Sequence, residues 1–247
     1  MNKSILIIIS CTYIFSIFLL LFTFKSELTL FILLQNSLLY LYISYLIFRC
    51  FANSGTEIFS LASKITFIRL NISLVMLTAA INSSMNLTIF DIFYAERIIA
   101  ILAISALILD GLDGFVARKY NHVTKFGEII DQESDNFLML VLSISLYLNR
   151  EAGIYIFLIP SYRYLFIFSM KKYDWLKIEL PISQFRKFAC AVTILLMVIA
   201  QDIYFSPKNT TFLVILSLFI ITFSFAKDII WLYRNKYEKN RNKYEKT

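Results

Sequence analysis

Apolar runs of about 20 residues, the length that crosses a bilayer as a helix, recur along almost the whole sequence. The 247 residues are 59% hydrophobic and include 24 phenylalanines, far above the proportions of a soluble domain. In hydrocarbon every backbone N–H and C=O must find a partner within the protein, so only helices and closed barrels span. Apolar runs of this length, in which polar and apolar residues do not alternate, indicate helices. We therefore expect an all-α, multi-pass integral membrane protein.

The positions of the basic residues predict how these helices are oriented. Positive charge gathers in alternate loops and in the tail after Arg234, which by the positive-inside rule places both termini and the loop after Arg118 in the cytoplasm. Frequent Phe, Ile, Asn and Lys are typical of an AT-rich genome and favour a bacterium, and hence its inner membrane. The expected spans are residues 4–24, 29–49, 65–82, 95–117, 127–148, 152–170, 184–204 and 210–232.

Four regions are expected along the chain. Residues 1–50 hold two N-terminal spans, 51–62 form an interfacial linker, 63–233 form a core of six spans, and 234–247 form a basic cytoplasmic tail. The tail repeats Arg-Asn-Lys-Tyr-Glu-Lys after seven residues. It could attach to anionic headgroups, or be a solvated helix end that reinforces the topology.

Cysteine usage and net charge exclude several classes of site. Cys11, Cys50 and Cys190 are odd in number and scattered in or beside apolar runs, which indicates neither a disulfide framework nor a zinc site. The net charge of +7 lies in loops and the tail, where membrane topology explains it, so no nucleic-acid partner is expected.

Residues 110–135 are acidic in a chain that is otherwise apolar. They hold six of the 17 acidic residues and three of the five glycines, and carboxylates near hydrocarbon are costly enough to suggest a function. Asp110 and Asp113 are three residues apart and Asp131 and Asp135 four, so each pair shares a helix face. One pair closes a span and the other opens the next. We expect the four carboxylates to meet at the cytoplasmic edge.

Four neighbouring carboxylates would repel one another unless a divalent cation joined them. Oxygen-only ligation suits Mg²⁺, Mn²⁺ or Ca²⁺ rather than zinc. Gly111 and Gly114 would let a ligand approach the helix backbone closely. Gly127 lies at the start of the next helix, whose N-terminus favours anions. The planar guanidinium group of Arg118 could donate two hydrogen bonds to a phosphate. The stretch predicts a diphosphate site for phosphoryl-type transfer. A D-G-x-x-D-G string alone would also suit a calcium-like turn or a helix end, although the spacing does not fit an EF-hand.

The full pattern resembles the signature of the CDP-alcohol phosphatidyltransferase family. From Asp110 to Asp135 the chain reads D-G-x-x-D-G-x-x-A-R, eight residues, then G-x-x-x-D-x-x-x-D, and matches every defined position. The resemblance covers about residues 62–232. It implies a homodimer, a membrane core of six helices and an active site that faces the cytoplasm. This chain has two further N-terminal spans that lie outside the resemblance.

The resemblance also implies a reaction and its residues. A phosphatidyl group would pass from a CDP-alcohol, such as CDP-diacylglycerol, to an acceptor hydroxyl with release of CMP, using Mg²⁺ or Mn²⁺. Asp135 would be the general base and also a metal ligand. The other metal ligands would be Asp110, Asp113 and Asp131, and the nucleotide and phosphate contacts would be Gly111, Gly114, Arg118, Gly127, Thr66 and Arg69.

Two basic residues fit positions of the resembled family, Arg163 on the fourth core helix and Lys187 at the start of the fifth, whereas Arg186 stands where the family usually has glycine. Arg163, Arg186 and Lys187 could form a pocket for a phosphorylated acceptor, which favours glycerol 3-phosphate or inositol phosphate over serine or choline. They could equally anchor helix ends at the cytoplasmic surface. Glu133 is expected to point away from the paired aspartates, and His122 to be a loop residue.

Two readings from other classes stay open at this point. A membrane cation transporter would also use acids, but usually near the bilayer midplane on broken helices, whereas here they cluster at one edge. An inactive scaffold is the other, and the intact Asp110, Asp113, Asp131 and Asp135 argue against it. Metal-dependent CMP release would distinguish the enzyme from the transporter and from the inactive scaffold.

Overall fold

The computed structural model describes residues 3–24, 30–53, 61–84, 92–119, 125–149, 152–178, 180–181, 183–201 and 206–244, which form helices and no strand. A helix covers most of every predicted span. The fold therefore follows the apolar runs of the sequence closely. The helices of this part are α1 (Lys3–Phe24), α2 (Leu30–Asn53), α3 (Leu61–Ser84), α4 (Ile92–Lys119), α5 (Lys125–Asn149), the short 3₁₀ helix η2 (Ile154–Phe157), α6 (Leu158–Lys172), the 3₁₀ helix η3 (Asp174–Lys177), α7 (Gln184–Ile199) and α8 (Pro207–Tyr244).

Several helix ends differ from the expected boundaries. Helix α2 continues to Asn53, into the predicted linker, most of which lies outside the described residues. Helix α8 runs on through Tyr244, well past the predicted end of its span. Pro160, inside the expected span 152–170, lies in the first turn of α6, where backbone N–H groups have no partner within the helix. A proline at this place removes no hydrogen bond of the helix.

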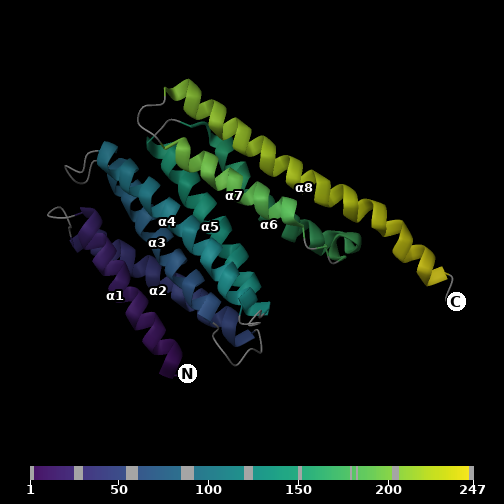
Figure 1. Ribbon diagram of the computed structural model, residues 1–247, viewed down its shortest axis with the longest axis horizontal. Coiled ribbons are helices and arrows are strands. Elements are labelled where there is room, and N and C mark those ends of the chain that lie inside the picture. Colours follow the sequence, from purple (N-terminus) through teal and green to yellow (C-terminus); the bar gives the residue numbers. More distant parts are fainter. Residues whose placement is uncertain are drawn as a thin grey trace.

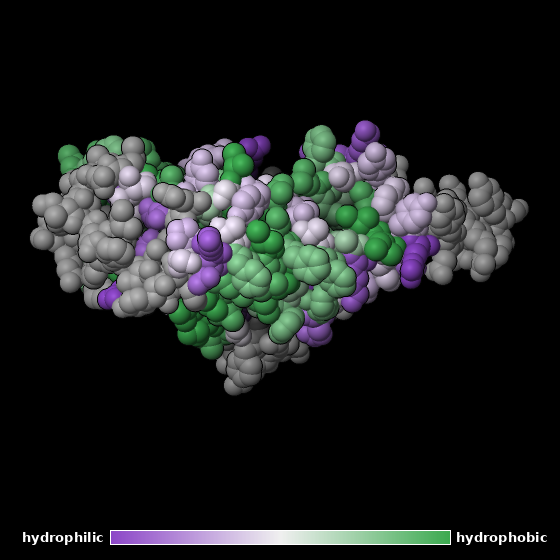
Figure 2. Space-filling model, turned by 90° about the horizontal axis from the view of Figure 1, so that it is seen from above, coloured by the Kyte–Doolittle hydropathy of each residue, from purple (hydrophilic) through white to green (hydrophobic). Residues whose placement is uncertain are grey.

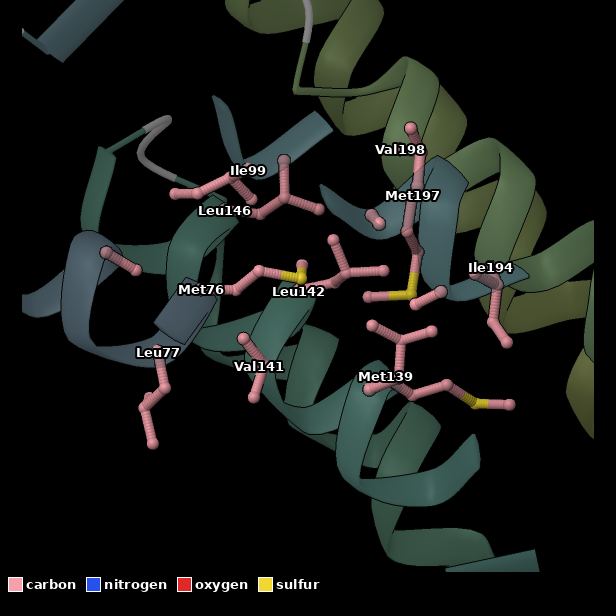
Figure 3. Close-up of a cluster of buried hydrophobic side chains, with 14 of the residues drawn as sticks. Met76, Leu77, Ile99, Met139, Val141, Leu142, Leu146, Ile194, Met197 and Val198 are labelled. Carbon is pink, nitrogen blue, oxygen red and sulfur yellow. The ribbon is translucent and has the colours of Figure 1, made fainter. Parts of the chain in front are cut away.

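Helix α3 is the centre of the bundle. Its most extensive contacts are with α4 and α5, while α1 and α2 pack on one side of this group and α6, α7 and α8 on the other (Figure 1). The main hydrophobic core lies where α3, α4, α5 and α7 meet. Figure 3 shows Met76, Ile99, Leu142 and Met197 from these four helices, and all are fully buried.

Buried polar contacts attach α1 and α2, which we call the N-terminal hairpin, to α3. Asn36 of α2 donates to Ser16 Oγ of α1 at 2.9 Å and accepts from Thr78 Oγ1 of α3 at 3.4 Å. Tyr40 Oη donates to the Ile9 carbonyl at 2.7 Å. Such hydrogen bonds join helices in a lipid environment, where apolar burial alone discriminates little between neighbours. The hairpin is therefore built onto the core as part of one bundle.

The outer surface is apolar over much of its extent. Within the described residues, three helices are long and apolar enough to cross a membrane by length and composition, along Leu30–Arg49, Ser63–Ser84 and Pro207–Asn235, and Ile9–Leu21 is a shorter apolar segment. Large apolar side chains on α2, α4 and α8 point outward. Hydrophobic side chains cover much of the middle of the face seen in Figure 2. The other expected spans remain predictions.

Candidate active site

Three of the four signature aspartates meet in the structure. Asp110 near the end of α4, and Asp131 and Asp135 near the start of α5, each place a carboxylate oxygen within 4.8 Å of the other two. Asp113 lies in α4, but its side chain is outside the described part, as is that of Arg118, and the surroundings of Gly114 are not described either. The three described carboxylates form a compact acidic cluster, which we call the aspartate triad.

Arg69 of α3 lies at the centre of the triad. Its Nη1 donates to Asp110, while Nη2 lies 2.7 Å from Asp131 Oδ1 and 3.1 Å from Asp135 Oδ1. Its Nε donates to Ser134 Oγ at 3.0 Å. The carboxylates of α4 and α5 are thus brought together through a cation on a third helix, because α4 and α5 both pack on α3.

The triad and its arginine differ in exposure. The Arg69 side chain is only 1% exposed, whereas those of Asp110, Asp131 and Asp135 are 36%, 42% and 25% exposed. The cation therefore lies below carboxylates that a ligand can still reach. Thr66, also expected at the site, is buried on α3 one turn before Arg69.

Gly111, next to Asp110, lies against open space. A Cβ atom added at this position would meet no atom within 4 Å apart from its immediate helix and chain neighbours. A glycine in a helix costs about 1 kcal/mol relative to alanine, so packing within the protein does not account for its presence here. The space is compatible with a ligand against the α4 backbone. Gly127 lies in the first turn of α5 and is partly buried.

Helix α7 lies along another side of the triad. The charge of Lys187 acts electrostatically on Asp131. The charges of all three carboxylates and of Arg69 act on Cys190, which lies one turn after Lys187. Lys187 is exposed. Of the three basic residues expected to bind the acceptor, Lys187 is the one whose charge acts on a residue of the triad, Asp131.

Arg163 and Arg186 each bind a carboxylate outside the triad. Arg163 Nη2 of α6 lies 2.7 Å from Glu133 Oε1 of α5, and Arg186 Nη1 lies 3.3 Å from Asp228 Oδ2 of α8. Glu133 points away from the paired aspartates, as its position in the helix predicts. The three cations thus have different contacts in this structure, and a shared pocket for a phosphorylated acceptor stays a prediction.

The donor set of the triad suits a hard divalent cation. It offers carboxylate oxygens alone, which Mg²⁺ and Mn²⁺ prefer and which zinc sites rarely consist of. The oxygens are mutually close and partly exposed. The residues present therefore fit a divalent metal ion.

Comparison with known proteins agrees with the motif. Residues 59–232, most of the chain, match the CDP-alcohol phosphatidyltransferase family. The chain belongs to this family. Because CDP-alcohol phosphatidyltransferases are membrane enzymes and three described helices can span, the chain is a membrane protein. The matched region includes the whole triad and Arg69, and excludes α1 and α2.

Curated relatives of this CDP-alcohol phosphatidyltransferase carry a more specific description. Two proteins described as CDP-diacylglycerol–glycerol-3-phosphate 3-phosphatidyltransferase are similar to it. The one from Rickettsia bellii is 30% identical over 117 residues, 47% of this chain and 60% of the relative. The one from Rickettsia typhi is 42% identical over 52 residues, 21% and 29% respectively. The matches thus span less than two thirds of either relative. No solved structure matches the chain.

Proposed function

We propose that the protein transfers the phosphatidyl group of CDP-diacylglycerol to glycerol 3-phosphate and releases CMP. The observation that carries this proposal is the aspartate triad around Arg69, inside the region that matches the family. The names of the Rickettsia relatives favour this donor and this acceptor. Inositol phosphate, serine or another alcohol remain the alternative acceptors.

In this proposal the chain supplies the metal ligands and the binding site for the nucleotide. Asp110, Asp113, Asp131 and Asp135 would hold Mg²⁺ or Mn²⁺, which when bound neutralises negative charge on the donor diphosphate. The open space beside Gly111 would receive the cytidine nucleotide, with Gly114, Gly127, Thr66 and Arg118 lining the same site. Arg69 would hold the carboxylates in register from below.

The group transfer is a substitution at phosphorus. The acceptor hydroxyl oxygen forms a bond to the phosphorus that carries diacylglycerol, and the bond from that phosphorus to the bridging oxygen of CMP breaks. Asp135 would take the hydroxyl proton as the general base. Lys187, which acts electrostatically on the triad from α7, is the best placed cation for the acceptor phosphate.

Orientation and assembly follow from the same proposal. The triad and both termini would face the cytoplasm of a bacterial inner membrane, where the soluble acceptor is made, and the protein would be a homodimer. Labelling of single cysteines at Ser206 and at Asn235 with an impermeant maleimide on intact cells tests the orientation. Ser206, at the opposite end of α8, should react and Asn235 should not.

The decisive assay is CMP release by the purified protein. With CDP-diacylglycerol and Mg²⁺ or Mn²⁺, glycerol 3-phosphate should give the highest rate in a panel that includes inositol phosphate, inositol and serine. Chelation should abolish the release and Mn²⁺ should restore it. Absence of metal-dependent CMP release with every acceptor would leave a transporter or an inactive scaffold as the better description. Release with a different acceptor would retain the family reaction and replace the substrate.

A further inference from the structure

Two arginines hold the acidic start of α5 from different helices. Arg69 of α3 contacts Asp131, Ser134 and Asp135, and Arg163 of α6 contacts the two residues between, Gln132 and Glu133. Every side chain from 131 to 135 therefore binds one of the two guanidinium groups. This arrangement suggests that Arg163 has a role at the triad although it does not touch it.

The contacts of Arg163 form a small network between α5 and α6. Its Nη2 and Nε donate to Glu133 Oε1 at 2.7 and 3.2 Å, and its Nη1 donates to Gln132 Oε1 at 2.7 Å. Tyr164 Oη donates to the second carboxylate oxygen of Glu133 at 3.2 Å. Three donors of one planar group thus engage two adjacent α5 residues, which restrains the rotation of α5 more than a single contact would.

Helical geometry puts this network across α5 from the triad. Successive residues of an α-helix are rotated by about 100°, so Glu133 points about 200° away from Asp131. The guanidinium of Arg163 is consequently directed at the back of α5, while Asp131 and Asp135 face Arg69.

Small rotations of α5 would matter greatly to a metal site. A side-chain tip lies about 5 Å from the helix axis, so a rotation of about 20° moves it by about 2 Å. Metal–ligand distances tolerate deviations of only about 0.2 Å. A restraint on the back of the helix can therefore decide whether Asp131 and Asp135 reach one ion together.

We propose that Arg163 is a positioning residue that acts through Glu133 and Gln132, holding α5 in the rotation that aims Asp131 and Asp135 at the metal. In this role it is not a ligand of the acceptor phosphate. The proposal deepens the proposed function and rests on it for the metal, but the metal can be measured without the reaction. The Arg163 and Glu133 side chains are 22% and 38% exposed. Because such partly exposed pairs add little to stability, the expected effect is on ligand geometry rather than on folding.

Mn²⁺ binding to the purified protein in detergent, followed by electron paramagnetic resonance, is the direct test. Arg163→Ala and Glu133→Ala should each weaken Mn²⁺ binding by about 10-fold, the usual effect of removing a residue that supports a metal ligand. Glu133→Gln, which keeps an acceptor oxygen for Arg163, should lose less. The charge exchange of Arg163→Glu with Glu133→Arg should recover affinity relative to either single reversal.

The matched control is Tyr162→Phe on the same helix. It removes the 2.8 Å hydrogen bond between the Tyr162 hydroxyl and Thr222 of α8 without touching α5, so Mn²⁺ affinity should stay at the wild-type value. Retained helical content and an unchanged unfolding temperature would show that Arg163→Ala is folded.

Steady-state kinetics separates positioning from acceptor binding. If Arg163 positions α5, Arg163→Ala should lower kcat and leave the KM for glycerol 3-phosphate within about twofold. Acceptor binding predicts instead a large rise in that KM with unchanged Mn²⁺ affinity, and this result would overturn the proposal. Unchanged Mn²⁺ affinity in both alanine variants would overturn it too, whether or not the wild-type protein releases CMP. Failure of CMP release alone would contradict only the proposed function.

Discussion

Arg69 Nη2 lies 2.7 Å from Asp131 Oδ1, which joins the central helix α3 to the acidic start of α5. The same guanidinium reaches Asp110 on α4. One buried cation therefore balances carboxylates from two helices that would otherwise repel each other. A metal ion bound by these oxygens would either share the carboxylates with Arg69 or displace the guanidinium group from them. Both cations would therefore reduce the repulsion between the same carboxylates.

Arg69→Gln should destabilise the metal-free protein. Removing one partner of a fully buried ion pair costs about 3–5 kcal/mol, because the remaining charge loses its compensation. The carboxylates left here are 25–42% exposed, so water screens them and we expect a smaller loss of about 2 kcal/mol. Thermal unfolding in detergent measures the loss, and added Mn²⁺ should raise the unfolding temperature more in the variant than in the wild type, since a bound ligand stabilises the folded state.

Arg186→Gln is the comparison for that experiment. The Arg186 side chain is 41% exposed at its ion pair with Asp228, and partly exposed pairs contribute about 0–1 kcal/mol. A loss in Arg69→Gln no larger than in Arg186→Gln would contradict a central role for Arg69 in holding the triad.

Asp135→Asn should lower kcat with little effect on folding. Loss of a general base typically costs about 10²–10⁴-fold in rate, and asparagine keeps the size of the side chain. CMP release at saturating substrates is the measurement. Glu128→Gln, an exposed acid in the first turn of the same helix, should retain full activity. Equal losses in the two variants would show that a general change of charge on α5, rather than Asp135, is responsible.

Gly111→Ala should separate stability from activity. The added methyl group meets open space, and alanine favours a helix by about 1 kcal/mol over glycine, so the unfolding temperature should rise slightly. The same methyl group would project into the space proposed for the nucleotide, so kcat/KM for CDP-diacylglycerol should fall. A variant that is both more stable and fully active would mean that the nucleotide lies elsewhere.

Asn36→Ala should loosen the N-terminal hairpin. Asn36 is fully buried and links Ser16 to Thr78, and interhelical hydrogen bonds in membranes contribute about 0.6–2 kcal/mol. We expect a loss of about 1 kcal/mol in the free energy of unfolding and faster proteolysis between α2 and α3. Leu38→Ala, at a position exposed on the same helix, should have little effect, and equal effects of both would argue against the polar link.

Local patterns in the sequence predicted much of this molecule. The lengths of the apolar runs predicted where the helices lie, because a membrane helix satisfies its own backbone and needs only a fixed number of apolar residues. Spacings of three and four residues placed Asp131 with Asp135 on one face and Glu133 on another, since helix geometry depends on neighbours alone. The family, too, could be recognised from the signature around Asp110.

The partners of these residues depend on how the helices pack. Nothing in the signature indicated that Arg69 would lie among the aspartates, and the family resemblance implied that Arg69 would contact nucleotide or phosphate. Likewise, the sequence suggested that Arg163 could join Arg186 and Lys187 in an acceptor pocket, but it gave no sign that Arg163 would bind Glu133 on the far face of α5. Charges from distant segments meet only after α3, α4, α5 and α6 have packed. That packing follows from many weak apolar contacts, which no single spacing in the sequence records.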